Sequence, residues 1–160
     1  MQYCARSAFE VFLAQKSLYV AQAHSCLSGK KENFMTKKAI VTDKAPAAVG
    51  PYSAAVSANG SINVSGQLPV DPATGEFAGE DIRSQTRQSL TNIQNILEAA
   101  GASMADVVET TVLLSDINEF GAMNEVYAEF FAEPYPARAA FQVVALPKGA
   151  KVEIKAVARI

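Results

Sequence analysis

Two stretches of the chain repeat apolar residues at the spacing of an α-helix. The clearer one covers residues 81–100, and Gly101 directly after it is typical of a helix C-terminus. The other covers residues 119–131 and ends before Pro134 and Pro136, which cannot continue a helix. We therefore predict two helices. The apolar stripe of the second consists of Phe120, Met123, Tyr127, Phe130 and Phe131.

Shorter apolar and β-branched runs predict six strands. Their ranges are 38–42, 53–58, 61–65, 107–114, 139–146 and 151–158. Asn59-Gly60, between the second and third strands, is a strong signal for a two-residue hairpin. A long helix between two strands implies a right-handed crossover onto the same sheet. These elements predict an α+β domain, a single mixed β-sheet with two helices packed on one face.

The composition is that of an ordinary globular protein. Of the 160 residues, 49% are hydrophobic and 19% are charged, and the formal net charge is -2. This length suits one domain with a sizeable core. The charge balance argues against a surface built for nucleic acid, and no apolar run approaches the roughly 18 residues of a membrane span. We therefore expect a cytoplasmic protein that binds neither nucleic acid nor membranes.

Histidine and cysteine are confined to the start of the chain. His24, Cys4 and Cys26 all precede Met35, and neither residue type occurs after it. If the body is the functional unit, this excludes thiol chemistry, Ser-His triads, zinc sites of the usual ligand types and acid–base catalysis by histidine. We expect no metal and no cofactor.

Residues 1–34 differ from the body, residues 35–160, because they lack a convincing core-facing stripe. Glu10 and Lys16 interrupt the apolar run that a secretory signal needs. The segment from Gly29 to Met35 can be encoded with a purine-rich ribosome-binding sequence just before an ATG. We therefore expect an N-terminal extension that is disordered or a mis-called start. A targeting segment or a genuine arm is the alternative.

Arg138 is the first candidate for carrying chemistry. It follows Pro136-Ala137 and leads into the apolar strand predicted at 139–146, so we expect it at an end of the sheet. A guanidinium there can hold a carboxylate through two parallel hydrogen bonds, which a lysine cannot match. A surface salt bridge explains the same residue equally well.

Glu153 is the second candidate. It lies between Val152 and Ile154, whose side chains point to the other face of the strand. Lys151 and Lys155 share the face of Glu153, so a solvated strand face is the alternative interpretation.

The pairing of the last two strands decides whether these candidates meet. If the turn is centred on residues 146–147, Glu153 lies opposite Ala140, and Arg138 is its diagonal neighbour at about 7–8 Å. A turn centred on residues 148–149 moves Arg138 out of range. The sequence does not choose between the two registers.

Other polar positions are weaker candidates. Asn124 interrupts the apolar stripe of the second helix, four residues after Phe120. A buried amide without a hydrogen bond costs about 1–3 kcal/mol, so Asn124 is expected to bond either a neighbouring loop or a ligand. Tyr52 lies in a Gly-Pro-Tyr turn, and Ser65-Gly66 lies at a strand end. A purely structural role is the alternative for all of them.

Several ordered motifs together resemble the RidA (YjgF-type) family of reactive-intermediate deaminases. The likeness runs from about residue 37 to residue 160, nearly the whole body. The matching pieces are APAAVGPYS at 45–53, VSGQLPVDP at 64–72, RQSLTN at 87–92, Asn124 with Tyr127, PAR at 136–138 and LPKGAKVEI at 146–154.

The resemblance implies a homotrimer of chorismate-mutase-like subunits with ligand clefts between them. It implies hydrolysis of 2-imino and enamine acids, such as 2-iminobutanoate and 2-iminopropanoate, to 2-keto acids and ammonia. By the same likeness Arg138 holds the substrate carboxylate and Glu153 positions the attacking water. The implied pocket is lined by Tyr52, Ser65, Gly66, Phe120, Asn124, Tyr127 and the backbone of Ala139 and Ala140.

One departure from the family pattern concerns sulfur chemistry. Many members have a cysteine two residues after the arginine, where this chain has Ala140. Thiol-based or redox-switched roles are therefore not expected, while backbone contacts at this position are unaffected.

Two other functions remain open from the sequence. A non-catalytic protein that binds 2-keto acids would lose its ligand in Arg138→Ala, as the enzyme would, but would keep it in Glu153→Gln. An RNA-directed or chaperone role is sometimes attached to the family. The acidic body without a basic stripe argues against ribonuclease activity.

Overall fold

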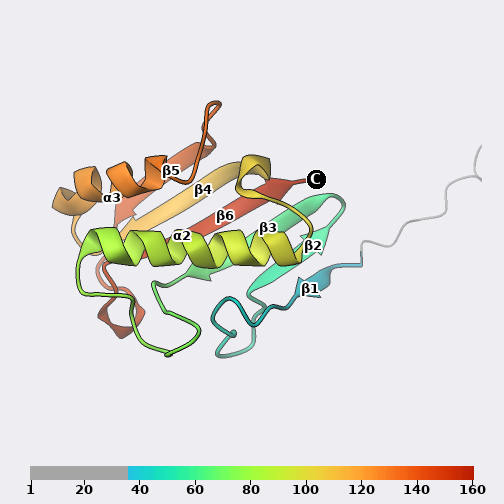
Figure 1. Cartoon of the computed structure of the whole chain (residues 1–160), viewed down its shortest axis with the longest axis horizontal. Coiled ribbons are helices and arrows are strands. Elements are labelled where there is room, and N and C mark those ends of the chain that lie inside the picture. Colours follow the sequence, from blue (N-terminus) through green and yellow to red (C-terminus); the bar gives the residue numbers. More distant parts are fainter. Residues whose placement is uncertain (1–35) are drawn as a thin grey trace, which may run out of the picture. The chain divides into compact units, whose positions relative to one another are not determined.

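The computed structural model describes residues 36–160, so the prediction for residues 1–34 falls outside the described part of the chain. Lys37–Ile160 forms one compact unit. A single mixed sheet of six strands carries two helices on one face (Figure 1), and the predicted fold class is confirmed. Within residues 36–160, no helix combines the length and the apolar character needed to cross a membrane.

The sheet is mixed, with one parallel pair. Its strands are β1 (Lys38–Ile40), β2 (Ala55–Ala58), β3 (Ser61–Gln67), β4 (Val107–Leu114), β5 (Ala137–Gln142) and β6 (Val152–Arg159). They lie side by side in the order β1-β2-β3-β6-β4-β5. Neighbours are antiparallel except β4 and β5, which run parallel. β3 and β4 thus share one sheet, as the crossover through the long helix predicts.

The turn between β2 and β3 is the hairpin that Asn59-Gly60 predicts. Asn59 has a φ of 50° and Gly60 a φ of 71°, and a two-residue type I′ turn requires positive φ at both central residues. Ala58 and Ser61 pair across the turn. The turn therefore fixes the register of β3, which carries two of the predicted site residues.

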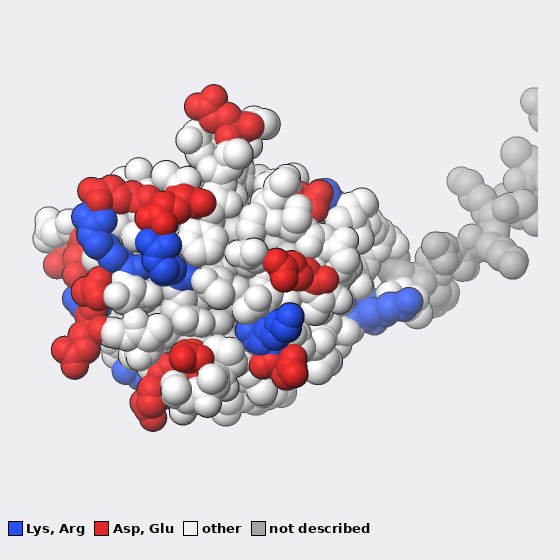
Figure 2. Space-filling model, viewed as in Figure 1, with Lys and Arg blue, Asp and Glu red and all other residues white. Residues whose placement is uncertain are grey.

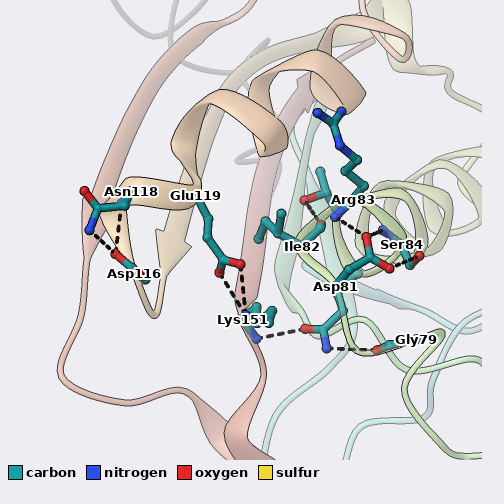
Figure 3. Close-up of polar contacts among 11 residues, drawn as sticks. Gly79, Asp81, Ile82, Arg83, Ser84, Asp116, Asn118, Glu119 and Lys151 are labelled. Atoms are coloured by element: carbon teal, nitrogen blue, oxygen red, sulfur yellow. Dashed lines mark hydrogen bonds and ion pairs between the residues drawn. The ribbon is translucent and has the colours of Figure 1, made fainter.

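Both helices lie on the same side of the sheet (Figure 1). They are α2 (Ile82–Ala99) and α3 (Phe120–Ala128), and the short 3₁₀ helices are η1 (Met104–Asp106), η2 (Ile117–Glu119) and η3 (Pro147–Gly149). α2 begins where predicted because Asp81 caps it (Figure 3). The Oδ1 atom of Asp81 accepts from the backbone N–H groups of Arg83 at 2.9 Å and Ser84 at 3.0 Å.

α3 is shorter than the predicted helix at 119–131. The N–H groups of Glu129 and Phe130 bond the carbonyls of Val126 and Tyr127, three residues back, so the last turn tightens and the α-helix ends at Ala128. The apolar stripe nevertheless reaches beyond the helix, because Phe131 is buried in the core.

The core lies between the sheet and the helices. Leu90 and Ile93 of α2 are fully buried and share one hydrophobic cluster with Val152 and Ile154 of β6. Complete burial of such an aliphatic side chain contributes about 1.5–3 kcal/mol. Because Val152 and Ile154 both point into this core, Glu153 between them is directed to the opposite face of the sheet, away from the helices.

The predicted pairing of the last two strands is wrong. β4 lies between β5 and β6, so neither register for a direct pair applies. The chain passes from β4 through α3 to β5, and such a crossover places β5 parallel to β4 at the sheet edge. β5 also begins two residues earlier than predicted and ends at Gln142, so Arg138 lies within the strand. The apolar β6, buried at every second residue, takes the central position.

Polar contacts tie the start of α2 to the start of β6 (Figure 3). The amide of Gln85, 3% exposed, donates to the Gly79 carbonyl at 3.0 Å, and its oxygen accepts from the backbone N–H of Lys151 at 2.8 Å. The ammonium of Lys151 pairs with Glu119 of η2 at 2.9 Å. Because Lys151 directly precedes β6, these contacts hold the strand end that carries Glu153.

Candidate active site

Tyr52, Ser65, Gly66 and Glu153, four of the predicted site residues, line one cavity. Its volume is about 690 Å³. The walls come from the loop before β2, from the end of β3 with the segment that follows it, and from η3. Most of the lining is apolar, and Lys148 contributes a cationic side chain. The cavity therefore combines one carboxylate, two hydroxyls and a largely apolar wall.

A β-bulge lies where β3 passes Glu153. Val64 pairs with Ala156 of β6, and Gln67 pairs with Ile154, so three steps along β3 match two steps along β6. The irregular residues between them are Ser65 and Gly66. A bulge disrupts the ladder locally and re-aims side chains, and here it does so at the floor of the cavity.

Gly66 provides the space that the carboxylate of Glu153 occupies. A Cβ atom built on Gly66 would lie 1.8 Å from Oε1 of Glu153 and 2.8 Å from its Cδ. Any larger residue would therefore displace the carboxylate. This close approach of backbone and side chain is the physical reason for a glycine at this position.

The two hydroxyl residues are held by local hydrogen bonds. Ser65 donates its O–H to the carbonyl of Ser53 at 2.7 Å. The hydroxyl oxygen of Tyr52 accepts from the N–H of Val49 at 3.3 Å, and 53% of Tyr52 is exposed. Ser65 thus keeps lone pairs as acceptors, and Tyr52 keeps its O–H as a donor toward a ligand.

Glu153 has the electrostatic character of a proton acceptor. Burial raises its pKa, because the charged form loses hydration in the cavity. Among the ion pairs of residues 36–160, none involves Glu153. A carboxylate with a raised pKa and no ion pair among these described residues is suited to take a proton from a bound water.

Asn92 shapes the cavity wall, and the sequence interpretation missed its role. This fully buried amide donates to the carbonyls of Leu68 at 3.2 Å and Val70 at 2.9 Å, two residues that line the cavity. Its oxygen accepts from Gln88 at 2.9 Å. The sequence does contain a signal for Asn92. Like Asn124, it is a polar residue among the apolar positions of a helix.

Arg138 rests on two aromatic rings of α3. Its Cζ atom lies 4.4 Å from the ring centroid of Tyr127 and 5.4 Å from that of Phe120. Its Nη1 atom is buried and has no hydrogen-bond partner among the described residues. An unsatisfied buried donor costs about 1–3 kcal/mol, more when charged, so this guanidinium is suited to receive an anion.

The remaining predicted residues lie on the two elements that hold Arg138 and its aromatic neighbours, β5 and α3. Asn124 is half-buried on α3, one turn after Phe120. Ala139 and Ala140 follow Arg138 on β5, where they pair with Thr111 and Val112 of β4. Since β5 is the edge strand of the sheet in residues 36–160, one side of its backbone has no neighbouring strand there, and these peptide groups are available to a ligand.

The predicted site is divided into two groups that do not meet within one chain. Arg138 pairs with Thr110 of β4 and faces the helices, whereas Glu153 pairs with Leu113 of β4 and faces away from them. The expected common cavity for the two charged groups within one chain is therefore wrong. The physical reason is twofold. β4 lies between the two strands, and the partners Thr110 and Leu113 are three residues apart on it, so they point to different faces.

Comparison with known proteins gives a consistent result. Residues 42–160 match the protein family described as Endoribonuclease L-PSP. A Bos taurus protein named 2-iminobutanoate/2-iminopropanoate deaminase is 52% identical over 124 residues, which cover 78% of this chain and 90% of that protein. The Homo sapiens protein of the same name is 48% identical over 124 residues, with the same coverage.

Solved structures share the fold as well as the sequence. RidA from the Antarctic bacterium Psychrobacter is 50% identical, with a TM-score of 0.74 over 77% of this chain and 99% of that one. TdcF from E. coli with bound serine is 44% identical, with a TM-score of 0.73 over 77% of this chain and 98% of that one.

Proposed function

Because the chain belongs to the RidA (YjgF-type) family, described as Endoribonuclease L-PSP, we propose that it hydrolyses short 2-imino acids to 2-keto acids and ammonia. It is an enzyme that acts on carbon–nitrogen double bonds. Relatives with about 50% sequence identity to it are named 2-iminobutanoate/2-iminopropanoate deaminase. 2-Iminobutanoate and 2-iminopropanoate are the proposed substrates. The observation that carries the proposal is the buried Nη1 of Arg138, which has no partner among residues 36–160.

Arg138 is proposed to bind the carboxylate of the substrate. A guanidinium offers two parallel N–H donors that match a carboxylate, and the aromatic seat of Tyr127 and Phe120 limits its movement. TdcF, the E. coli relative, holds serine, which has a carboxylate next to a carbon that bears nitrogen. A 2-imino acid has the same arrangement around its second carbon.

Glu153 is proposed to activate the water. The oxygen of water attacks carbon 2 of the protonated imine, and Glu153 takes up the proton that the water loses. Glu153 returns this proton to the nitrogen of the resulting carbinolamine. The carbon–nitrogen bond then breaks, ammonia leaves, and the hydroxyl oxygen becomes the carbonyl oxygen as its proton passes to Glu153. A protonated imine is already electrophilic, so positioning and charge complementarity can provide the acceleration.

The complete site is proposed to form between copies of the chain in a homotrimer. Arg138 and Glu153 face opposite sides of the sheet, so one chain supplies only half of the site to each cavity. Phe141 of β5 and Val108 of β4 are large apolar residues that are 55% and 46% exposed, which is typical of a surface covered on assembly. A ring closed by identical head-to-tail interfaces would bring Arg138 of one copy to Glu153 of the next.

A subunit-mixing experiment tests both the activity and this assembly. Arg138→Ala and Glu153→Gln proteins are prepared separately, and each is expected to keep about a hundredth or less of the wild-type activity toward 2-iminobutanoate generated by an amino-acid oxidase. Co-expression in equal amounts should restore about a quarter of the wild-type activity, because a quarter of the interfaces then combine an intact Arg138 with an intact Glu153. If the wild type does not release keto acid and ammonia faster than the uncatalysed hydrolysis of the imine, the proposed activity is refuted. An inactive mixture of active-site variants, with an active wild type, would refute the shared site.

The charge distribution does not favour the nuclease activity that the family description suggests. On the face that carries the helices, basic and acidic side chains lie next to each other (Figure 2). Arg83 pairs with Glu125, and Arg87 pairs with Glu129 at 2.6 Å, so arginines of α2 are neutralised by glutamates of the α3 region. A protein that follows a nucleic-acid backbone needs a continuous basic surface instead.

A further inference from the structure

A buried hydroxyl pair lies directly beneath Arg138. The Oγ1 atom of Thr110 and the phenolic oxygen of Tyr127 are 2.7 Å apart, and either can be the donor. Thr110 is 1% exposed and Tyr127 is 5% exposed. Burial raises the pKa of Tyr127, so its hydroxyl stays protonated and can donate to Thr110.

Thr110 also touches the seat of Arg138 from the sheet side. Thr110 on β4 and Arg138 on β5 are directly paired across the two strands, so their side chains share one face. The Tyr127 ring approaches the same place from α3 and stacks 4.4 Å from the guanidinium carbon. Phe131 also packs against the tyrosine, with ring centroids 4.5 Å apart. The hydroxyl pair therefore joins β4 to the ring on which Arg138 lies.

The occupied hydroxyl changes the interpretation of Tyr127. Its oxygen already bonds Thr110 inside the core, so its contribution to the site comes from the ring and not from a hydrogen bond to substrate. A buried hydroxyl pair adds little to stability compared with an apolar pair of the same shape, because both hydroxyls lose hydration on folding. A directional bond does fix the tilt of the ring, which an apolar contact does not.

We propose that Thr110 is a positioning residue for substrate binding. Its hydroxyl holds the Tyr127 ring in place, the ring holds the Arg138 guanidinium, and the guanidinium then meets the substrate carboxylate without rearranging. Preorganisation of this kind strengthens binding by reducing the ordering cost. The inference rests on the proposed role of Arg138 as the carboxylate-binding group, and it predicts an effect on KM, with kcat left unchanged.

The test compares three variants of the full chain. Thr110→Val keeps the shape of the side chain and removes the hydroxyl, and Tyr127→Phe removes the other partner of the same bond. Either variant should raise KM for 2-iminobutanoate by about three- to tenfold, as expected for loss of one hydrogen bond, with kcat within about twofold. Thr110→Ser restores the hydroxyl and should return KM to within about twofold of the wild type.

Thr86→Val is the matched control for a general loss of stability. Thr86 is fully buried on α2, and its hydroxyl bonds the carbonyl of Ile82 at 2.7 Å, within the helix and outside the proposed site. Its KM should equal that of the wild type, whatever its melting temperature. An unchanged KM in Thr110→Val, or an equal rise in Thr86→Val, would overturn the inference.

Calorimetric binding of 2-oxobutanoate, a 2-keto acid product, separates this inference from the proposed reaction. If the wild type hydrolyses no imine but binds 2-oxobutanoate through Arg138, the proposed reaction fails. The inference then stands only if Thr110→Val weakens that binding by about three- to tenfold. If the wild type neither hydrolyses the imine nor binds 2-oxobutanoate, both are refuted.

Discussion

Arg138 and Glu153 occupy opposite faces of one sheet, and their surroundings differ in kind. The guanidinium lies on the helix side, stacked on two rings that α3 supplies, and one of its nitrogens is buried without a partner among the described residues. The carboxylate lies in a largely apolar cavity on the other side, where burial raises its pKa. Neither Arg138 nor Glu153 takes part in an ion pair among residues 36–160. The two groups are complementary in charge, as the proposed active site between subunits requires.

Removing the guanidinium is expected to have the largest effect. Arg138→Ala should lower kcat/KM for 2-iminobutanoate by about 100- to 1,000-fold, because the substrate carboxylate loses its buried cationic partner. Steady-state hydrolysis of the imine measures this. Arg87→Ala is the matched control, since Arg87 is an exposed arginine paired with Glu129 and lies outside both half-sites. A similar loss in both variants would contradict a specific role for Arg138.

Removing the charge of Glu153 should lower the turnover number clearly and should affect ligand binding less. Glu153→Gln keeps the size of the side chain but cannot accept a proton, so kcat should fall by about 100-fold. The dissociation constant of 2-oxobutanoate should change little, as calorimetry can show. A variant that retains kcat would mean that the carboxylate neither accepts the proton nor orients the water.

Displacing the carboxylate without removing it gives an intermediate effect. In Gly66→Ala the new Cβ would lie 1.8 Å from Oε1 of Glu153, so the side chain must move. Misplacement of a catalytic group by about 1 Å can cost up to 100-fold, and we expect kcat to fall by about 10- to 100-fold. Binding of 2-oxobutanoate by Arg138 should persist. Full activity in this variant would show that the position of the carboxylate is not critical.

The smallest predicted change is a shift in the pH dependence of kcat/KM. Glu153 must be deprotonated to act, so activity falls as pH drops through its pKa, which burial raises. A guanidinium from another copy would lower that pKa again. The acid limb of kcat/KM should therefore lie at higher pH in Arg138→Ala than in the wild type, whereas Arg138→Lys, which keeps the charge, should resemble the wild type. Identical limbs in all three proteins would contradict the meeting of the two half-sites.

Local features of the fold could be predicted from the sequence. Asn59-Gly60 specified a two-residue hairpin because both positions tolerate positive φ, and the apolar spacing of residues 81–100 specified α2. The orientation of Glu153 also followed from the sequence, because apolar neighbours on both sides of it point into the core. Each of these depends on interactions between residues close together in the chain.

The order of the strands could not be predicted in the same way. β5 and β6 are consecutive in the chain, and adjacency was the natural expectation, yet β6 pairs with β3 and β4. The choice depends on the pairing of β6 with β3 along one edge and with β4 along the other, which is a property of the whole sheet. The predicted contact between Arg138 and Glu153 was wrong for the same reason, because a diagonal contact required β5 and β6 to be neighbours.

The bulge in β3 places a constraint on insertions and deletions. Val64 and Gln67 are three residues apart and are both buried beside β6, which an unbroken strand with alternating sides would not allow. Loss of one residue between them would restore regular pairing but would remove the irregular backbone that makes room for the acidic side chain. Gain of one residue would shift the pairing of Gln67 with Ile154. Chain length in this short segment is therefore as restricted as the identity of its glycine, and variation among related sequences should occur by substitution there and by length changes elsewhere.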